Sequence, residues 1–323
     1  MEGRLVSEIR TNEYIINPII NVDTNTVLTF SHYGSIITLW DIRNAAKIRE
    51  TELDFYSFYD ATLIRYSNGN LCIVVSGLFI ENTNFGQKQI HKIAFINFDT
   101  FKVIRSDEDE IRSLEHLYYN ESNKSIIGYK SGGNFASLSI FCSKNLSFKE
   151  NLKTNYLNGR NIIFSTIDNI EVIIGSYANQ IRILNLETLE LIREIKLKDI
   201  DDGLYQIWKI AIHPIQNTLA IFFISKEEIW IWNIENNKCI KKLEFPKVEH
   251  FCFSFNGNFL LVAVESELLI FETKKYNLIE NLVQPIKEAS IGAIATSIDE
   301  NYFLIGAIGY DGYRNFGYMQ MWE

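Results

Sequence analysis

Short apolar runs rich in β-branched and aromatic residues alternate with polar turns along the whole chain, and no stretch shows the spacing of an amphipathic helix. Seven segments share one form: a strand that ends in a large apolar residue, a small polar turn, and a second strand. They are 37–50, 93–106, 138–151, 181–194, 229–242, 268–281 and the shorter 318–323. The pattern predicts an all-β protein built from repeated hairpins.

A further pair of apolar strands precedes these segments, as in 162–176, 208–224 and 250–266. Two hairpins give four strands per repeat, which is the composition of one β-propeller blade. The residues that end the third strand of each repeat are Trp40, Ile96, Phe141, Leu184, Trp232, Phe271 and Trp322. The sequence therefore predicts seven blades, with six or eight as the alternatives.

The last repeat stops after its third strand, at Trp322 and Glu323. The segment Gly3–Arg10 (GRLVSEIR) is similar to the fourth strands of other repeats, such as 47–51 (KIRET) and 191–195 (LIREI). We expect this N-terminal strand to join the last blade and close the ring, because closure removes an exposed sheet edge. Residues 1–323 are predicted to form one propeller domain.

The segment FSHYGSIITLWDI (30–42) resembles the second half of a WD40 repeat, with Trp40 and Asp41 as the signature dipeptide. IAIHPIQNTLA (210–220) and FSFNGNFLLVAV (253–264) resemble its first two strands, and the resemblance covers the whole chain. It implies a seven-bladed WD40-type β-propeller. The motifs are degenerate: only one Trp-Asp pair occurs and the Gly-His dipeptide of the family is absent. The family's hydrogen-bonded tetrad of His, Ser or Thr, Asp and Trp is therefore missing from nearly every blade.

Charge and composition narrow the classes of partner. The formal net charge is −9, and the longest basic clusters are pairs such as Lys241-Lys242 and Lys274-Lys275, so we expect no nucleic-acid partner. No apolar run approaches the roughly 18 residues of a membrane helix, and the N-terminus lacks the apolar region of a signal peptide, so no membrane insertion is expected. The four cysteines form no CxxC pair, which favours reduced thiols in the cytoplasm, or alternatively the nucleus.

The sequence offers no recognisable catalytic, cofactor or metal-binding motif. Its five histidines fall in five different predicted blades without ligand spacing. We therefore expect no cofactor, no metal and no enzymatic activity. The expected function is a protein-interaction scaffold or adaptor that is itself a monomer within a larger complex. A propeller enzyme with a site in the central channel is one alternative.

One face is predicted to bind the partner, since it gathers aromatic residues in loops of neighbouring blades. The predicted loops include the one that contains Phe58 and the long connection 78–89 of the second blade. Exposed Tyr and Phe commonly dominate binding energy at protein interfaces. Acidic clusters at 107–110 and 199–202 enter the same face and favour a partner with a basic segment; the alternative is acid that only keeps the protein in solution. The predicted contacts are Phe55, Tyr56, Tyr59, Phe85, Asp107, Asp109, Asp201, Asp202, Tyr310, Tyr313 and Phe316.

The segment LWDIR (39–43) resembles the WDxR box of substrate receptors in cullin-RING ubiquitin ligases. The resemblance implies that Arg43 would face the ligase adaptor protein. The alternative is a solvated arginine in a turn between the third and fourth strands. A ligase substrate receptor is thus the second alternative to a general scaffold.

Overall fold

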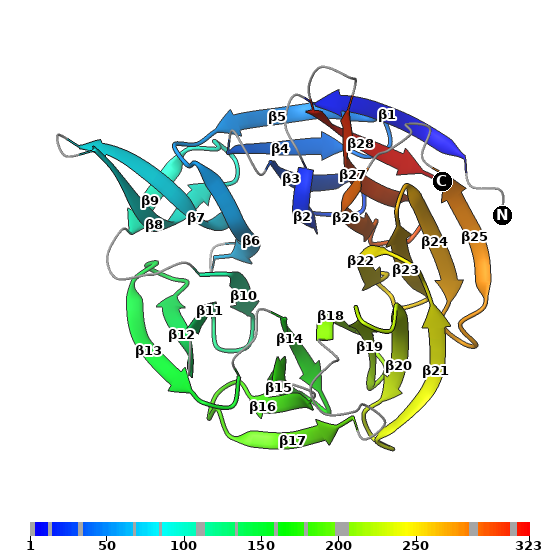
Figure 1. The fold of residues 1–323 in the computed structure, drawn as a ribbon. Coiled ribbons are helices and arrows are strands. Elements are labelled where there is room, and N and C mark those ends of the chain that lie inside the picture. Colours follow the sequence, from blue (N-terminus) through cyan, green and yellow to red (C-terminus); the bar gives the residue numbers. More distant parts are fainter. Residues whose placement is uncertain are drawn as a thin grey trace.

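The strands form a ring of seven four-stranded antiparallel sheets in the computed structural model (Figure 1). The structure describes residues 4–11, 15–31, 35–66, 69–83, 86–107, 114–132, 135–157, 161–177, 180–197, 207–283, 290–310 and 315–323. Every regular element in these ranges is a strand, and none of them is a helix that could span a bilayer. The all-β prediction and the count of seven blades are confirmed.

Each blade runs from an inner strand at the central channel to an outer strand at the rim. Blade 1 contains β2 (Ile15–Asn21), β3 (Thr26–Ser31), β4 (Ile36–Asp41) and β5 (Ala46–Glu52). Blade 2 contains β6 (Ser57–Arg65), β7 (Leu71–Thr83), β8 (Gly86–Asn97) and β9 (Val103–Asp107). Blade 3 contains β10 (His116–Asn120), β11 (Ser125–Gly132), β12 (Phe135–Cys142) and β13 (Phe148–Thr154). Blade 4 contains β14 (Ile162–Ile167), β15 (Ile170–Tyr177), β16 (Gln180–Asn185) and β17 (Leu191–Lys196).

The remaining blades follow the same order. Blade 5 contains β18 (Ile207–Ile212), β19 (Thr218–Phe223), β20 (Glu228–Asn233) and β21 (Lys238–Glu244). Blade 6 contains β22 (Val248–Phe253), β23 (Phe259–Val264), β24 (Glu267–Glu272) and β25 (Leu278–Val283). Blade 7 contains β26 (Ser290–Thr296), β27 (Phe303–Tyr310) and β28 (Asn315–Trp322), and β1 (Leu5–Thr11) is its fourth strand.

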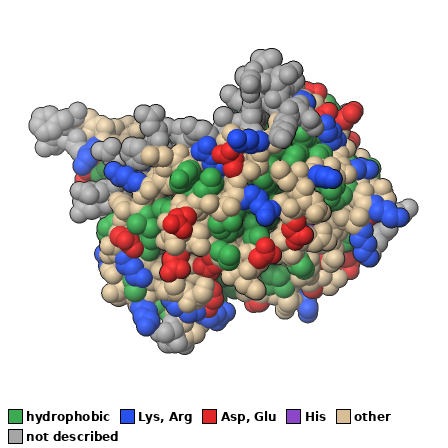
Figure 2. Space-filling view, turned by 90° about the horizontal axis from the view of Figure 1, so that it is seen from below, with side chains coloured by type: hydrophobic (Ala, Val, Ile, Leu, Met, Phe, Trp, Pro, Cys, Tyr) green, Lys and Arg blue, Asp and Glu red, His purple; other side chains and the backbone are tan. Residues whose placement is uncertain are grey.

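The core lies between blades, which explains the difference in composition between middle and outer strands. All six residues of β19 are buried. Leu219 and Phe223 pack towards blade 4, whereas Ala220 and Phe222 pack towards blade 6. A strand covered on both faces needs apolar residues on both, so middle strands are continuous apolar runs. On the side shown in Figure 2, the outer rim mixes apolar, acidic and basic side chains.

The residues that mark the repeat in the sequence coincide with a β-bulge. In blades 1 to 6, the pairing of the third and fourth strands shifts register immediately before this residue. The following turn places one residue at positive φ in every case: Ala45, Phe101, Leu146, Leu189, Asn237 and Tyr276. Four or five residues separate the two strands in these hairpins, and a loop of this length with one left-handed residue and an adjacent bulge is a common way to connect twisted strands. The repeated strand-turn-strand pattern therefore reflects one repeated hairpin.

The ring closes through β1, as predicted. β1 pairs antiparallel with β28, from Leu5 opposite Trp322 to Thr11 opposite Gly317. Arg4 and Glu323 extend the ladder with two backbone hydrogen bonds of 3.0 Å. The observed strand is thus shifted by one or two residues from the predicted Gly3–Arg10, and the closure itself is confirmed.

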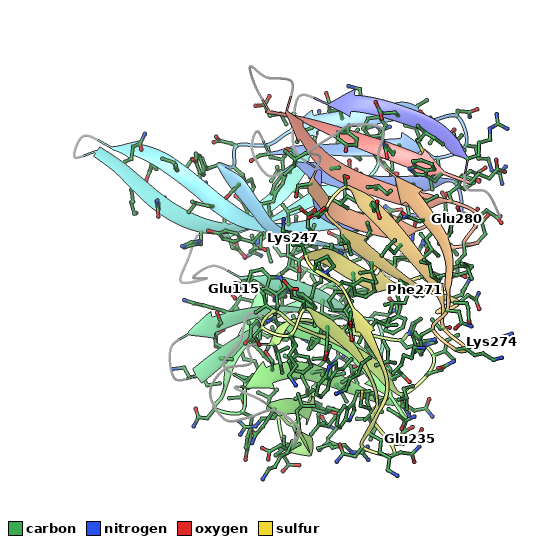
Figure 3. All side chains as sticks on the ribbon, turned by 45° about the vertical axis from the view of Figure 1, so that its right-hand side comes forward. Glu115, Glu235, Lys247, Phe271, Lys274 and Glu280 are labelled. Carbon is green, nitrogen blue, oxygen red and sulfur yellow. The ribbon has the colours of Figure 1, made fainter. Side chains whose placement is uncertain are left out.

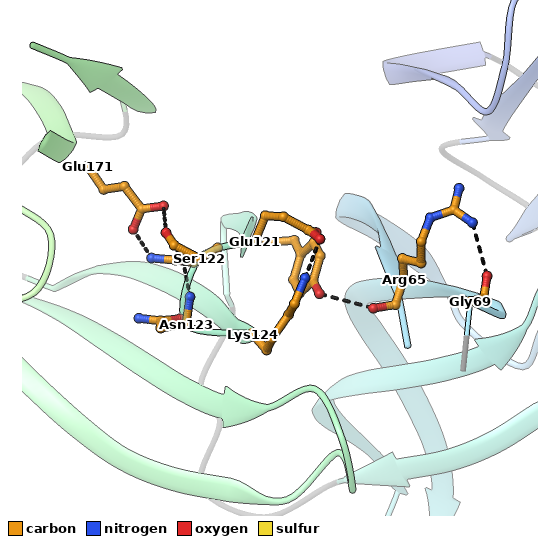
Figure 4. A network of polar contacts seen from close by, with 9 residues as sticks. Arg65, Gly69, Glu121, Ser122, Asn123, Lys124 and Glu171 are labelled. Carbon is orange, nitrogen blue, oxygen red and sulfur yellow. Dashed lines mark hydrogen bonds and ion pairs between the residues drawn. The ribbon is translucent and has the colours of Figure 1, made fainter. Parts of the chain in front are cut away.

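Polar contacts join neighbouring blades at the turns between first and second strands (Figure 4). The Tyr119 hydroxyl of blade 3 donates to the Arg65 carbonyl of blade 2 over 3.0 Å. Ser122 donates to Glu171 of blade 4 over 2.7 Å, and Asn120 donates to the same carboxylate. The bond from Asn120 satisfies a buried side chain, whereas the other two link the blades at exposed positions.

Blade 2 departs from the prediction. The segment 78–89 was expected to be a loop, but β7 and β8 remain paired as far as Thr83 and Gly86. β6 accompanies β7 only to Leu78, so the tip of this hairpin projects beyond the ring as a two-stranded arm (Figure 1). A two-stranded ribbon that projects from the ring needs no apolar face. The sequence of the arm is therefore polar, and it lacks the apolar pattern from which a strand is predicted.

Candidate protein-binding face

The ring has two different faces. What we call the upper face carries the connections between blades and the turns between second and third strands. The lower face carries the turns between first and second strands and those between third and fourth strands. Glu115 and Lys247 precede the first strands of blades 3 and 6 and belong to the upper face, whereas Glu235 and Lys274 lie in turns after third strands and belong to the lower face; Figure 3 labels all four. The described aromatic residues among the predicted contacts belong to upper-face segments; they are Phe55, Tyr56, Tyr59, Tyr310 and Phe316.

The start of blade 2 brings three of the predicted residues together. Phe55 is half-buried against Phe58, with 5.4 Å between ring centroids, and its carbonyl accepts a 2.5 Å hydrogen bond from Ser35 of blade 1. Tyr56 follows with 52% of its surface exposed. Tyr59 lies in β6 rather than in a loop, and its hydroxyl is 3.3 Å from Nδ1 of His91 in β8. Only Tyr56 of the three is well placed for contact with a partner.

The other predicted contacts are more scattered. Asp107 ends β9 and pairs with Arg105, whose Nε lies 2.8 Å from its carboxylate. Tyr310 and Phe316 belong to the paired strands β27 and β28 rather than to a loop. Phe85, Asp109, Asp201, Asp202 and Tyr313 lie outside the described residues.

Arg43 lies on the lower face, in the turn between β4 and β5, and it is exposed. The turn is fixed by Asp41, whose carboxylate accepts hydrogen bonds of 3.0 and 2.8 Å from the backbone and side chain of Asn44. Arg43 and the aromatic residues of blade 2 therefore belong to opposite faces. A partner that contacts one set need not contact the other.

In three first strands a β-bulge lies near the upper-face end of the strand. The register shifts between Phe58 and Asp60 in β6, between Ile207 and Lys209 in β18, and between Val248 and His250 in β22. The extra residues at these bulges are Tyr59, Trp208 and Glu249. A bulge bends the strand and redirects one side chain, so it can place an aromatic or acidic group at the entrance of the channel.

A hollow of about 420 Å³ opens on the upper face where blade 5 meets blade 6. Trp208 and Ile224 line it while leaving 52% and 47% of their surfaces exposed. Its other lining residues are Phe222, Glu227, Pro246, Lys247, Val248 and Glu249. Half-exposed large apolar side chains around a concave site are typical of places where a ligand side chain inserts.

The sequence pattern does not predict this hollow. WKIAI (208–212) has the pattern of an apolar inner strand, and that pattern predicts that Trp208 is buried. Its exposure depends on the bulge in β18, which in turn depends on pairing with β19. The only local signal is that the large residues Trp208, Ile224 and Pro246 all flank predicted upper-face turns.

Lys209, His250 and Cys252 lie close together on the inner strands β18 and β22. Burial lowers the pKa of Lys209 to about 8 and raises the pKa of the Cys252 thiol to about 12. Burial lowers the pKa of His250 well below its ordinary value, and the charge of Lys209 acts in the same direction. A protonated thiol is a weak nucleophile, so this arrangement does not activate Cys252. No group of three His, Cys, Asp or Glu side chains in the described ranges has the arrangement of a metal site.

Asp60 joins blade 2 to blade 3 beneath the upper face. Its carboxylate accepts hydrogen bonds from the backbone N–H of Leu117 over 2.7 Å and from that of Ala61 over 2.8 Å, and His116 Nδ1 lies 3.9 Å away. Burial raises the pKa of Asp60 to about 6, although His116 and the two N–H groups act in the opposite direction. The folded protein therefore binds this proton more tightly than the unfolded chain does.

The Asp60→Asn variant tests this consequence. Because the folded-state pKa lies above the ordinary value of 3.8, wild-type stability falls as pH rises from about 4 to about 6, and the loss is complete above that range. Over this pH range we expect the free energy of unfolding to fall by on the order of 1–3 kcal/mol less in the variant than in wild type. Urea unfolding of both proteins between pH 4 and pH 7.5 measures the difference. Parallel pH profiles for the two proteins would contradict the raised pKa.

The sequence was also compared with models of known protein families, and no family model matches it.

Proposed function

We propose that this chain is a WD40-type propeller that serves as a non-enzymatic protein-interaction scaffold and binds its partner on the upper face. The observation that supports this most is the concave upper-face site at which Trp208 and Ile224 leave about half of their surfaces exposed, together with the exposed Tyr56. A ring of rigid blades holds these side chains at fixed separations, which lowers the entropic cost of binding.

The WD40 assignment is supported by blade 1. Trp40 Nε1 donates a 2.8 Å hydrogen bond to the hydroxyl of Thr29 in the neighbouring strand, and both residues are buried. This is the Trp and Ser or Thr half of the tetrad that characterises the family. The Asp41 carboxylate accepts hydrogen bonds from Asn44 within its own turn. The blade thus keeps the buried tryptophan and its hydrogen bond to the neighbouring strand.

The charge of the upper face favours a partner with a basic segment. Glu227 and Glu249 border the hollow, and Lys247 beside them is paired with Glu265 over 3.1 Å. The chain as a whole carries a formal net charge of −9. Long-range attraction of this kind accelerates association and is screened by salt.

The proposal can be tested by capturing partners from cytoplasmic and nuclear extract and identifying them by mass spectrometry. The test compares variants of the upper face with variants of the lower face. Tyr56→Ala and Trp208→Ala alter the upper face, whereas the matched variants Ile215→Ser and Arg43→Ala alter the lower face. Ile215 is a suitable control because 76% of its surface is exposed. We expect at least one partner to be lost with upper-face variants only, and to bind about tenfold more slowly when salt rises from 0.05 to 0.5 M.

Two results would contradict upper-face binding. Partners that are retained by both upper-face variants and lost with Ile215→Ser would assign binding to the lower face. Co-purification of a cullin-RING adaptor that is lost with Arg43→Ala would instead favour the ligase receptor.

A further inference from the structure

We infer that the hollow between blades 5 and 6 binds one large apolar side chain, aromatic or aliphatic, from a partner peptide that carries Lys or Arg next to that residue. This inference rests on the proposed function and specifies the chemistry of its ligand. Its support comes from the lining of the hollow, the charges at its edge and the rigidity of its walls.

The lining is apolar on both sides. Blade 5 contributes Trp208 and Ile224, which are about half exposed, and the buried Phe222. The connection into blade 6 contributes Pro246 and the buried Val248. A side chain inserted here would cover the exposed indole and isoleucine surfaces, and the removal of apolar surface from water favours binding.

The charged groups at the edge favour a basic neighbour for the inserted side chain. Glu227 and Glu249 both line the hollow, whereas the neighbouring Lys226 is not part of its lining and has its ammonium 4.9 Å from the centroid of the Trp230 ring. Lys247 also lines it, but its ammonium lies 3.1 Å from the Glu265 carboxylate, so its charge is compensated. An acidic edge disfavours an anionic lipid surface or a phosphopeptide, both of which require basic groups.

The walls are held in place before any ligand binds. The Phe245 N–H donates a 2.7 Å hydrogen bond to the Glu227 carbonyl, which links the two segments that border the hollow. The Phe245 ring packs against Phe271 of β24 at 5.7 Å, and one oxygen of Glu249 accepts a 2.6 Å hydrogen bond from the Ile291 N–H of blade 7. A preformed site binds a side chain without a large ordering cost.

A phage-displayed library of random 12-residue peptides, selected on the full chain, tests the inference. We expect enriched peptides to contain a Leu, Ile, Met, Phe or Trp residue next to Lys or Arg. Their synthetic forms should bind the Trp208→Ala and Glu227→Lys variants at least about tenfold more weakly, because these changes remove the apolar wall or reverse the edge charge. The matched controls Ile215→Ser and Glu187→Lys, both exposed on the lower face, should bind like wild type.

Tryptophan fluorescence locates the bound peptide. All five tryptophans are described, and Trp40, Trp230, Trp232 and Trp322 are each at most 8% exposed, whereas Trp208 is 52% exposed. Acrylamide quenching therefore reports mainly on Trp208. A tryptophan-free enriched peptide should protect the fluorescence of wild type, and Trp208→Phe should abolish most of the quenching without peptide.

Absence of enrichment, enrichment of acidic or purely polar peptides, or equal binding to Trp208→Ala would overturn the inference. These results would leave the scaffold function standing if partner capture still depended on Tyr56. Failure of partner capture at both upper-face variants would instead reject the proposed function.

Discussion

Removal of residues 4–11 is expected to leave the protein aggregated or severely destabilised. These residues form β1, so their loss exposes the whole edge of β28. The fully buried side-chain amide of Gln320 would also lose the 2.8 Å hydrogen bond that it donates to Glu8. Leu5 and Ile9, which pack against the cores on the two sides of blade 7, would be lost as well. Unpaired apolar edges promote association between chains, and buried polar groups without partners cost about 1–3 kcal/mol each.

Size-exclusion chromatography and thermal unfolding of the shortened protein measure this effect. The matched control is Val6→Ser, which changes an exposed β1 side chain but keeps the backbone ladder. We expect the control to remain monomeric with a melting temperature close to that of wild type. A shortened protein that is monomeric and melts like the control would show that β1 does not close the ring.

Trp40→Ala is expected to give the largest loss of stability among the single substitutions considered. Trp40 is 4% exposed and packs with Leu304, Met319 and Met321 of blade 7, so it stabilises the interface at which the ring closes. Truncation of a buried tryptophan costs about 3–5 kcal/mol. This is a large part of the roughly 5–15 kcal/mol that stabilises a typical domain.

Trp208→Ala is the matched control for this prediction, because it makes the same chemical change at an exposed site. Exposed substitutions usually change stability by no more than about 0.5 kcal/mol. Denaturant unfolding should therefore separate the two variants clearly. If both unfold at the wild-type denaturant concentration, Trp40 does not pack between blades.

The architecture could be predicted because the strands of each blade pack against the neighbouring blades in the same way. Middle strands such as β19 face apolar neighbours on both sides, and third-strand residues such as Trp40 precede the same bulged hairpin. Both features therefore recur once per blade along the sequence. The closing strand was predictable for a related reason, since β1 has the composition of the other outer strands.

The candidate site was less predictable. Tyr59 and Trp208 occupy inner strands, and their direction depends on bulges that form only when the second strand pairs with the first. Phe58 illustrates the opposite error: it was expected in an aromatic loop, but it is 2% exposed and packs edge-on to Phe30 of blade 1. Local composition identifies aromatic residues, but the tertiary pairing decides whether each one faces the core or the solvent.

Amine cross-linking of the captured complex tests most directly the claim that a partner occupies the upper face. Blade 6 provides both reporters, because Lys247 lies at the upper-face hollow and Lys274 lies in a lower-face turn (Figure 3). We predict that cross-links to the partner involve Lys247 and the neighbouring Lys226, and that Lys274 remains unlinked. Cross-links confined to Lys274 and Lys275 would contradict the account.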